Sequence, residues 1–459
     1  MYINNIFQNT NHPKSILSQL KFAEGLPFAN VLSKQEIASN IENRHFRDRV
    51  FSLDITLWAF LSQVLSDDQS CQSAVAHVIA FFAGRGKETP SANTAAYCKA
   101  RSRLPEEIIS NLAKEGARQL EEQVPSKWLW RGKHIKLVDG STLFMPDTPE
   151  NQAAYPQSKN QKSGLGFPIA RIVAIISYAT GVVLDAEIGG CFGKGAGEHT
   201  LLRRLMHAFK PGDIALGDCY YGSFFLIAAL MRMQVDVVFP IHSGRNHDFR
   251  KGKSLGKKDH VVEWQKPQKP EWMTLEEYNE FPNKISIREA EIKEEKKGFR
   301  PRSRIIVTTF LDSNCVRKDD LKKIYDYRWC VELDLKSIKD TMRMGILRGK
   351  TPSIIRKEVW AHLLAYNIVR KIMAQSALVH VKKPRDLSFK LALQVVVAFR
   401  DANLFSELKH KIYQQLLKAI AYKTVGNRTG RHEPRKLKRR PKNYPLLTKP
   451  RYHYKKELS

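Results

Sequence analysis

The stretch IYDYRWCVELDLKSIKDTM, residues 324–342, is the most informative part of this sequence. Its pattern predicts a single helix. Five side chains fall on a stripe of that helix roughly 80° wide at about 100° per residue. They are Tyr325, Arg328, Glu332, Lys336 and Lys339. One helix face therefore carries an aromatic ring, an acid and three bases. An ordinary solvated helix, with Glu332 paired to Lys336 at i,i+4, is the plainer interpretation of the same pattern.

The charge of the chain indicates a polyanionic partner. Lys and Arg number 76 against 46 Asp and Glu, which gives a net charge of +30 at pH 7. Nucleic acid is the commonest polyanion, and an acidic membrane surface is the alternative. No apolar run is long enough to span a bilayer and no signal-peptide pattern follows Met1, so we expect no membrane association. The six cysteines are dispersed without a C-x-x-C pair, which predicts reduced thiols rather than a zinc site or disulfides.

Residues 1–125 are predicted to be all-helical and to bind DNA. Apolar helices are expected at 55–65 and 73–84, and a short basic helix restarts at 93–104 after Pro90. This helix carries Lys99, Arg101 and Arg103. A helix, a break and a basic helix outline a helix-turn-helix DNA reader. A helical bundle with solvated basic side chains explains the pattern equally well, and both interpretations stay open.

From residue 133 the hydrophobic period changes to that of strands. KHIKLVDGST reads as a strand that ends at Asp139 in a Gly-Ser turn. Further strands are expected at 168–178, 181–189, 213–218 and 235–242, with helices at 197–209 and 221–233. The order β-β-β-α-β-α-β predicts an α/β core with a mixed sheet over residues 126–350.

This core is interrupted and then followed by other elements. Residues 243–302 are charged, contain proline and include strand-like runs, which predicts a β-rich insertion because a structureless loop of this length is uncommon. Residues 351–422 are predicted to be helical and to serve dimerisation. Residues 423–459 form a basic, proline-spaced tail that cannot build a core. We expect the tail to lie along phosphates, with a merely solubilising role as the alternative.

Three acids in this arrangement predict a metal site. Asp139 and Asp218 each end a predicted strand and Glu332 lies on the helix, so the three can converge. Each alone is unremarkable, since Asp-Gly marks turns and Asp favours helix starts. Three carboxylates that close repel one another unless a hard cation neutralises them. Two Mg²⁺ ions about 3.5–4 Å apart would activate an attacking oxygen and stabilise the leaving oxygen at a phosphodiester.

The spacing Tyr325-x2-Arg328-x3-Glu332-x6-Lys339 resembles the Y-R-E-K signature of DDE transposases from bacterial insertion sequences of the IS-four type. VDGST around Asp139, GDCYYG around Asp218 and the long segment before Glu332 are similar to that family too. The stretches NTAAYCKARSRL and EPRKLKRRPKNYPLLTKPR extend the resemblance over most of the chain.

The resemblance implies an RNase H-like catalytic core in which Asp139, Asp218 and Glu332 are both the catalytic and the metal-binding residues. Mg²⁺ would be the cofactor, with Mn²⁺ as a substitute. Family members bind the terminal inverted repeats of their element, pair two ends in a dimeric complex, nick at the element end and transfer the 3′-hydroxyl to target DNA. We therefore expect double-stranded DNA as partner, a homodimer in the synaptic complex and a cytoplasmic, nucleoid-associated location.

By the same analogy, four residues of the signature helix contact phosphates near the cleavage point, namely Tyr325, Arg328, Lys336 and Lys339. Arg245 and Arg250 are expected to touch DNA from the insertion. An aromatic side chain of the insertion is expected to stack on a flipped base, with Trp264 and Trp272 as candidates and ordinary packing as the alternative.

Four further polar residues can lie near the site, although lone residues of these types are more often structural: His199, His242, Asn246 and His247. Two other functions stay open. The chain can be a DNA-binding descendant of a transposase that has lost catalysis, or a structure-specific nuclease on the same core.

Overall fold

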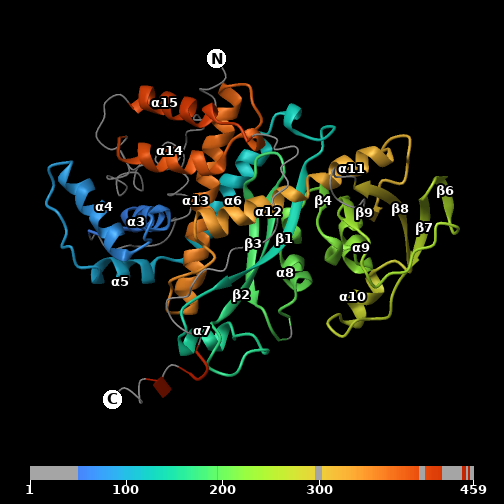
Figure 1. The fold of residues 1–459 in the computed structure, drawn as a ribbon, viewed down its shortest axis with the longest axis horizontal. Helices are drawn as coiled ribbons and strands as arrows, with labels where there is room; N and C mark the ends of the chain where they lie inside the picture. The colour runs from blue at the N-terminus through green and yellow to red at the C-terminus, as the bar shows by residue number, and fades with distance from the viewer. Residues whose placement is uncertain are drawn as a thin grey trace.

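The computed structural model describes residues 50–193, 195–294, 302–402, 409–425, 447–450 and 453–454. The first 49 residues of the predicted N-terminal region and most of the predicted tail lie outside the described residues. The described chain is a mixed α/β structure in which helices surround a long sheet (Figure 1). None of the described helices is both long and apolar enough to cross a membrane.

The sheet has nine strands in the order β3-β2-β1-β4-β5-β9-β8-β7-β6. Its core strands are β1 (Ile135–Phe144), β2 (Ile169–Ser177), β3 (Val183–Gly190), β4 (Ile214–Leu216) and β5 (Asp236–Pro240). β1 pairs antiparallel with β2 and parallel with β4, and β4 pairs parallel with β5. The predicted α/β core with a mixed sheet is thus confirmed.

The β-rich insertion extends this sheet instead of forming a separate module. Its elements are β6 (Lys253–Gly256), β7 (Asp259–Gln265), α10 (Leu275–Glu280), β8 (Lys284–Glu294) and β9 (Arg302–Thr308). β9 pairs antiparallel with β5, from Val238 opposite Thr308 to Pro240 opposite Ile306. The insertion occupies the right-hand part of Figure 1. Its backbone is therefore tied rigidly to the core strands.

Different helices cover the two faces of the sheet. On β1, Leu137 and Leu143 pack in a core that includes α6 (Glu106–Glu122) and α13 (Pro352–Val379). Val138, on the opposite face, packs with α8 (Glu198–Arg204) and α9 (Phe224–Arg232). The alternation follows from the period of two in a strand.

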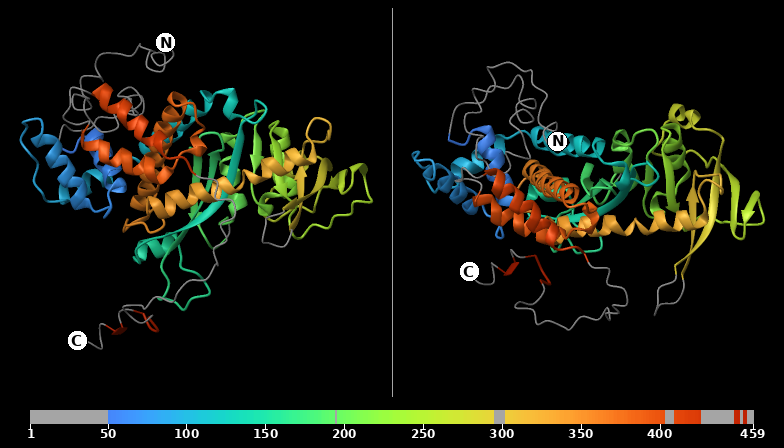
Figure 2. Two further views of the ribbon diagram at one scale, coloured as in Figure 1. Left: turned by 45° about the horizontal axis from the view of Figure 1, so that its top comes forward. Right: turned by 90° about the horizontal axis from the view of Figure 1, so that it is seen from above.

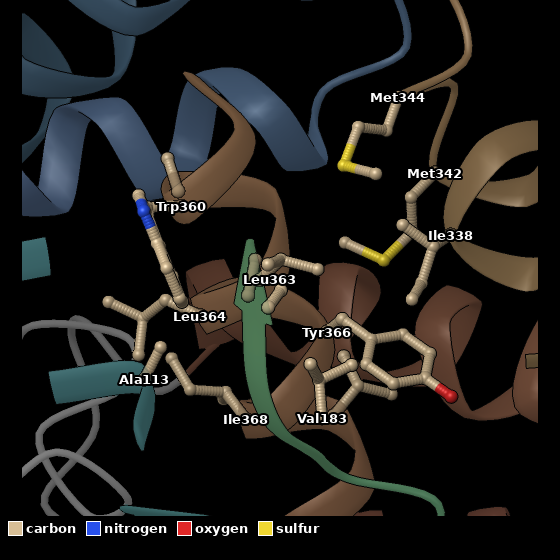
Figure 3. Packing of buried hydrophobic residues seen from close by; sticks show 14 of the residues in the cluster. Ala113, Val183, Ile338, Met342, Met344, Trp360, Leu363, Leu364, Tyr366 and Ile368 are labelled. Atoms are coloured by element: carbon tan, nitrogen blue, oxygen red, sulfur yellow. The ribbon is translucent and has the colours of Figure 1, made fainter. Parts of the chain in front are cut away.

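Helix α13 is the centre of the larger core. Of its 28 residues 20 are buried, as expected for a helix enclosed on all sides. Against it pack α3 (Leu53–Leu65), α14 (Phe389–Ala402) and α15 (Lys409–Tyr422), and α4 (Cys71–Ala83) and α5 (Ala95–Arg103) pack in turn on α3. Figure 3 shows how its side chains pack: Trp360, Leu363, Leu364 and Ile368 lie among Ala113, Val183, Ile338 and Met342. The N-terminal and C-terminal helical regions therefore share one hydrophobic core with the sheet.

The prediction of one unbroken helix over Ile324–Met342 is wrong, because the segment divides into separate elements. Two helices, α11 (Lys318–Asp326) and α12 (Trp329–Lys336), run one after the other along one side of the sheet (Figure 2). Between them Arg328 N–H donates to Tyr325 O at 2.9 Å, a bond that spans three residues and tightens the turn.

After α12 the backbone hydrogen bonds span five residues instead of four. Residues Ser337–Thr341 form a π-helical turn, closed when Met342 N–H donates to Ser337 O at 2.9 Å. No proline or glycine marks either change in the sequence. A tertiary anchor accompanies them: Asp334 on α12 is fully buried and bonded to Arg370 and Arg385. Packing, not local propensity, sets the path of this segment.

The expectation that a strand ends at Asp139 is also wrong. β1 continues through Asp139 and Gly140 to Phe144, and Gly140 pairs with Val173 in β2. Asp-Gly normally favours a turn. Here the antiparallel partner strand supplies the backbone bonds that keep the doublet extended.

Candidate active site

Two of the three predicted acids lie at the same edge of the parallel strands. β4 pairs with β1 only at Ile135–Leu137, so β1 has lost its β4 neighbour where Asp139 lies. Asp218 follows β4 by two residues and begins the 3-10 turn Cys219–Tyr221, accepting a hydrogen bond from Tyr220 N–H at 2.8 Å. The parallel pairing of the two strands thus brings both aspartates together.

The charges of two other acids act on the carboxyl group of Asp139. Burial is the main cause that raises the pKa of Asp139, to about 6, and the charges of Asp218 and Glu198 contribute in the same direction. The Gly140 N–H, which donates to Asp139 Oδ1 at 2.8 Å, and the charge of Arg328 oppose this increase. The site therefore holds negative charge that the protein itself does not fully neutralise.

Arg328 links Glu332 electrostatically to Asp139. On α12, Glu332 Oε1 lies 2.7 Å from Arg328 Nη1, and the acid remains about one-third exposed. Arg328 also acts electrostatically on Asp139, so one guanidinium is paired with Glu332 and lowers the pKa of Asp139. An i,i+4 ion pair does form on this helix, but with Arg328 rather than with Lys336.

The donor set fits a hard divalent cation. Asp139 and Asp218 offer carboxylate oxygens, the ligands that Mg²⁺ prefers, and the raised pKa of Asp139 marks charge that a cation would neutralise. Among the described residues no three His, Cys, Asp or Glu side chains are grouped closely enough to hold a metal. Glu332 would complete the set on exchanging Arg328 for the cation.

The remaining residues of the signature take different positions. Lys339, in the π-helical turn, donates from Nζ to Ser141 Oγ at 2.9 Å and so lies against the strand that carries Asp139. Lys336 is exposed. Tyr325 is buried, with the Arg328 guanidinium 5.7 Å from its ring centroid. The phenol ring is thus part of the support of Arg328.

A cavity of about 540 Å³ opens at Tyr220, in the turn that follows Asp218, and Trp272 lines it. His199, Arg203, Tyr220 and Phe225 line it as well. Trp272 is 50% exposed, and the guanidinium of Arg203 lies 3.7 Å from its ring centroid. The cavity therefore combines aromatic surface with charges of both signs, because Arg232, Glu277 and Glu280 line it too, and Arg203 lies over the ring of Trp272.

Trp264, the other predicted stacking residue, is placed differently. It is 3% exposed, and its Nε1 donates to Glu289 Oε1 at 2.8 Å. Arg245 covers the ring, with its guanidinium 3.7 Å from the centroid. Trp264 and Arg245 therefore pack together within the insertion, while Trp272 offers an open face.

Some of the other predicted DNA-contacting residues are exposed, and some form hydrogen bonds or ion pairs within the protein. Lys99 and Arg103 are exposed on α5. Arg101 turns inward and donates from Nη1 to Gln63 Oε1 at 2.9 Å. Arg250 is exposed and pairs with Asp248, its Nε 2.9 Å from Oδ1.

Of the four polar residues that the sequence analysis named as lying near the site, the structure places one next to Asp218. His242, Asn246 and His247 are exposed. His199 contacts Tyr220 O through Nε2 at 2.6 Å, which places it next to Asp218. Burial lowers the pKa of His199, so a neutral imidazole is expected at pH 7.

Sequence reasoning missed Glu198, which the structure places beside Asp139. An acid in the first turn of a helix is common because it favours the helix dipole. The stretch GEHT therefore contained no signal that distinguished Glu198 from an ordinary helix start.

Comparison with known proteins shows which family the chain belongs to. Residues 130–368 match the Transposase DDE domain family. Transposase InsG for insertion sequence element IS4, from Escherichia coli (strain K12), is 25% identical over 419 residues, which are 88% of this chain and 89% of that protein. A cryo-EM structure of a piggyBac transposase synaptic complex with hairpin DNA has a TM-score of 0.42 at 10% identity, covering 86% of this chain and 84% of that one. The family predicted from the signature is thereby confirmed, and the chain belongs to the DDE transposases, enzymes that cleave and transfer DNA strands.

Proposed function

We propose that this transposase binds the terminal inverted repeats of an insertion sequence and cleaves and transfers DNA strands at Asp139, Asp218 and Glu332. The observation that carries the proposal is the meeting of Asp139 and Asp218 at one edge of β1 and β4. Glu332 is included because it pairs with Arg328, whose charge also acts on Asp139. The core is proposed to be RNase H-like, and the reaction to follow a two-metal DDE mechanism.

Divalent cations, Mg²⁺ with Mn²⁺ as a substitute, would supply the activation of the attacking oxygen and the stabilisation of the leaving oxygen. The residues of the chain would hold them and orient the DNA. Asp139 and Asp218 are fixed by backbone N–H donors at Gly140 and Tyr220. Such preorganised carboxylates need no rearrangement when they take up a cation.

Basic side chains close to the acids would hold the phosphates that flank the cleaved bond. Lys339 lies against Ser141, and Arg328 pairs with Glu332 while its charge acts on Asp139. Arginine binds phosphate by two parallel hydrogen bonds, and lysine binds it as a point charge. Once a cation takes the carboxylate of Glu332, the guanidinium of Arg328 would become available to phosphate.

The wider DNA path would use exposed positive charge. A groove between the insertion and α11 is lined by five lysines and two acids: Lys257, Lys258, Lys293, Lys318, Lys322, Glu291 and Asp319. Lys99 and Arg103 on α5 and Arg250 in the insertion would add phosphate contacts. Neutralised phosphates release counterions, so affinity is expected to fall with salt.

The cavity at Tyr220 suits an unstacked base. The open face of Trp272 would replace the stacking that a flipped base loses, and Arg203 already shows that the ring accepts a planar cation. We assign the catalytic core to residues 126–350, with helical DNA-binding residues 1–125, helices 351–422 for dimerisation and a basic tail 423–459. Two subunits would pair two element ends.

Cleavage of the element's own ends tests this function. Purified full-length protein, mixed with DNA carrying the inverted repeats that flank its gene, should nick at the repeat boundary only with Mg²⁺ or Mn²⁺. Asp139→Asn and Glu332→Gln should abolish nicking while end binding persists. Wild-type nicking by either variant would refute the assignment. Joining of the cut end to a target plasmid separates a transposase from a nuclease.

A further inference from the structure

Glu198 approaches the site from the sheet face opposite to α12. On β1, Gly140 shares the face of Val138, which packs with α8 and α9. A Cβ added to Gly140 would lie 2.7 Å from Glu198 Cδ and 3.0 Å from each carboxylate oxygen. The missing side chain at Gly140 is therefore what allows the carboxylate of Glu198 to reach β1, one residue from Asp139.

Two side chains hold this carboxylate in place. Tyr221, fully buried and three residues after Asp218, donates its hydroxyl to Glu198 Oε2 at 3.2 Å. Arg171 on β2 approaches Oε1 with Nε at 3.7 Å, which is long for an ion pair, and donates from Nη1 to Ala196 O at 3.2 Å. Glu198 thus joins the strand of Asp139 to the turn of Asp218, with its charge only loosely paired.

We propose that Glu198 is a fourth acid of the divalent-cation site, supplying negative charge from α8 as Glu332 does from α12. The inference rests on the proposed function, since it needs Asp139 and Asp218 to hold the cation. A hard cation is bound more tightly as carboxylate charge around it increases. Two aspartates at one edge of the sheet would coordinate a cation from one side only. Acids from both faces of the sheet would surround it.

A purely structural clamp is the competing explanation, and two substitutions separate it from the proposal. Glu198→Gln removes the charge but keeps the volume and an oxygen that accepts from Tyr221. Tyr221→Phe removes that hydrogen bond but keeps the charge. A charge role predicts that only the first substitution weakens cation binding, whereas a clamp predicts that both variants change together.

Mn²⁺ binding to the full-length protein, measured by calorimetry at pH 7.5 without DNA, is the test. Glu198→Gln should weaken binding by about tenfold or more, in the range found when groups around a metal site are removed. Tyr221→Phe should stay within about threefold of wild type. Glu187→Gln is the matched control, because Glu187 pairs with Arg204 of the same helix at 3.1 Å. It should bind Mn²⁺ as wild type does.

Asp139→Asn separates failure of this inference from failure of the proposed function. If Asp139→Asn loses Mn²⁺ binding while Glu198→Gln does not, Glu198 is outside the site and the proposed function stands. If Asp139→Asn also binds as wild type, the site itself is misassigned. Equal losses in Glu198→Gln and Tyr221→Phe would overturn the charge role in favour of the clamp.

Gly140→Ala provides a second route should Glu198→Gln fail to fold. Its methyl group must displace the Glu198 carboxylate from β1 while the charge stays on the chain. The same loss of Mn²⁺ affinity is expected, and unchanged affinity in a folded Gly140→Ala protein would count against the proposal. Thermal unfolding of each variant reports whether it is folded.

Discussion

Lys339 Nζ lies 2.9 Å from Ser141 Oγ, which joins the π-helical turn after α12 to the strand that carries Asp139. A π-helical turn inserts an extra residue into the helical path, and such turns are frequent at functional sites. Here the turn places Lys339, the last basic residue of the signature, against β1 at Ser141, two residues from Asp139.

Lys339→Ala should therefore reduce DNA binding through the loss of one phosphate contact. We expect binding of the element end to weaken for every sequence alike and the salt slope of log affinity to fall by about one. Binding titrations at several salt concentrations measure both. Ser141→Ala removes the hydrogen bond but not the charge and should leave the slope unchanged. A wild-type slope for Lys339→Ala would show that the lysine touches no phosphate.

Asp139→Asn should stabilise the metal-free protein at neutral pH. The folded pKa of Asp139, about 6, lies above its usual 3.8, so the folded state keeps its proton longer than the unfolded state. Stability is then fully present below pH 3.8 and is lost as pH rises through about 6, by at most about 3 kcal/mol. Asparagine does not ionise, so the Asp139→Asn variant does not lose this stability as the pH rises. Urea unfolding at pH 7.5 and pH 4 without divalent cations should show a gain only at the higher pH.

Nicking should follow the ionisation of the same carboxyl group. A cation binds the ionised acid, so with subsaturating Mg²⁺ the rate should increase with pH through about 6 and then level off. Saturating Mg²⁺ should move the midpoint to lower pH, because cation and proton compete for Asp139. A rate that is flat between pH 5 and 7.5 at low Mg²⁺ would exclude this coupling.

Asp334→Asn should destabilise the fold strongly. The carboxylate of Asp334 is fully buried, Arg385 Nη1 lies 2.7 Å from its oxygens, and Arg370 and Tyr366 donate to it as well. Removing this charge leaves two guanidinium groups without their counterion, a loss of about 3–5 kcal/mol. Urea unfolding measures it.

Glu332→Gln is the matched control for Asp334→Asn on the same helix. Its ion pair with Arg328 is partly exposed, so the loss of stability should stay below about 1 kcal/mol although nicking is abolished. Equal destabilisation by the two substitutions would show that the buried network does not anchor α12.

The two tryptophans of the insertion should respond in opposite ways to truncation. Trp264→Ala removes a buried ring and should cost about 3–5 kcal/mol of unfolding free energy. Trp272→Ala should change stability far less, because half of the ring is exposed, but should weaken stacking on an extruded base by about 1–3 kcal/mol. Fluorescence of 2-aminopurine at the element end reports the stacking. Unchanged fluorescence with Trp272→Ala would remove it as the stacking residue.

Local patterns in the chain were sufficient to predict the element order and the family. Alternating and buried apolar runs located the core strands, because a strand with a buried face must repeat every two residues. The spacing of Tyr325, Arg328, Glu332 and Lys339 resembles the signature of the transposase family, and that resemblance, not helix geometry, predicted the family that the comparison confirms. The helices after residue 350 followed equally from their periodicity.

Tertiary structure alone decided the geometry of the site. Antiparallel pairing with β2 keeps Asp139 inside β1, where the sequence indicated a turn. The buried Asp334 network and the π-helical turn set the path of the signature segment. Glu198 reaches β1 next to Asp139 only because Gly140, 58 positions earlier in the numbering, has no side chain. Contacts between residues so distant in sequence depend on how strands and helices pack, and a local pattern contains no record of that packing.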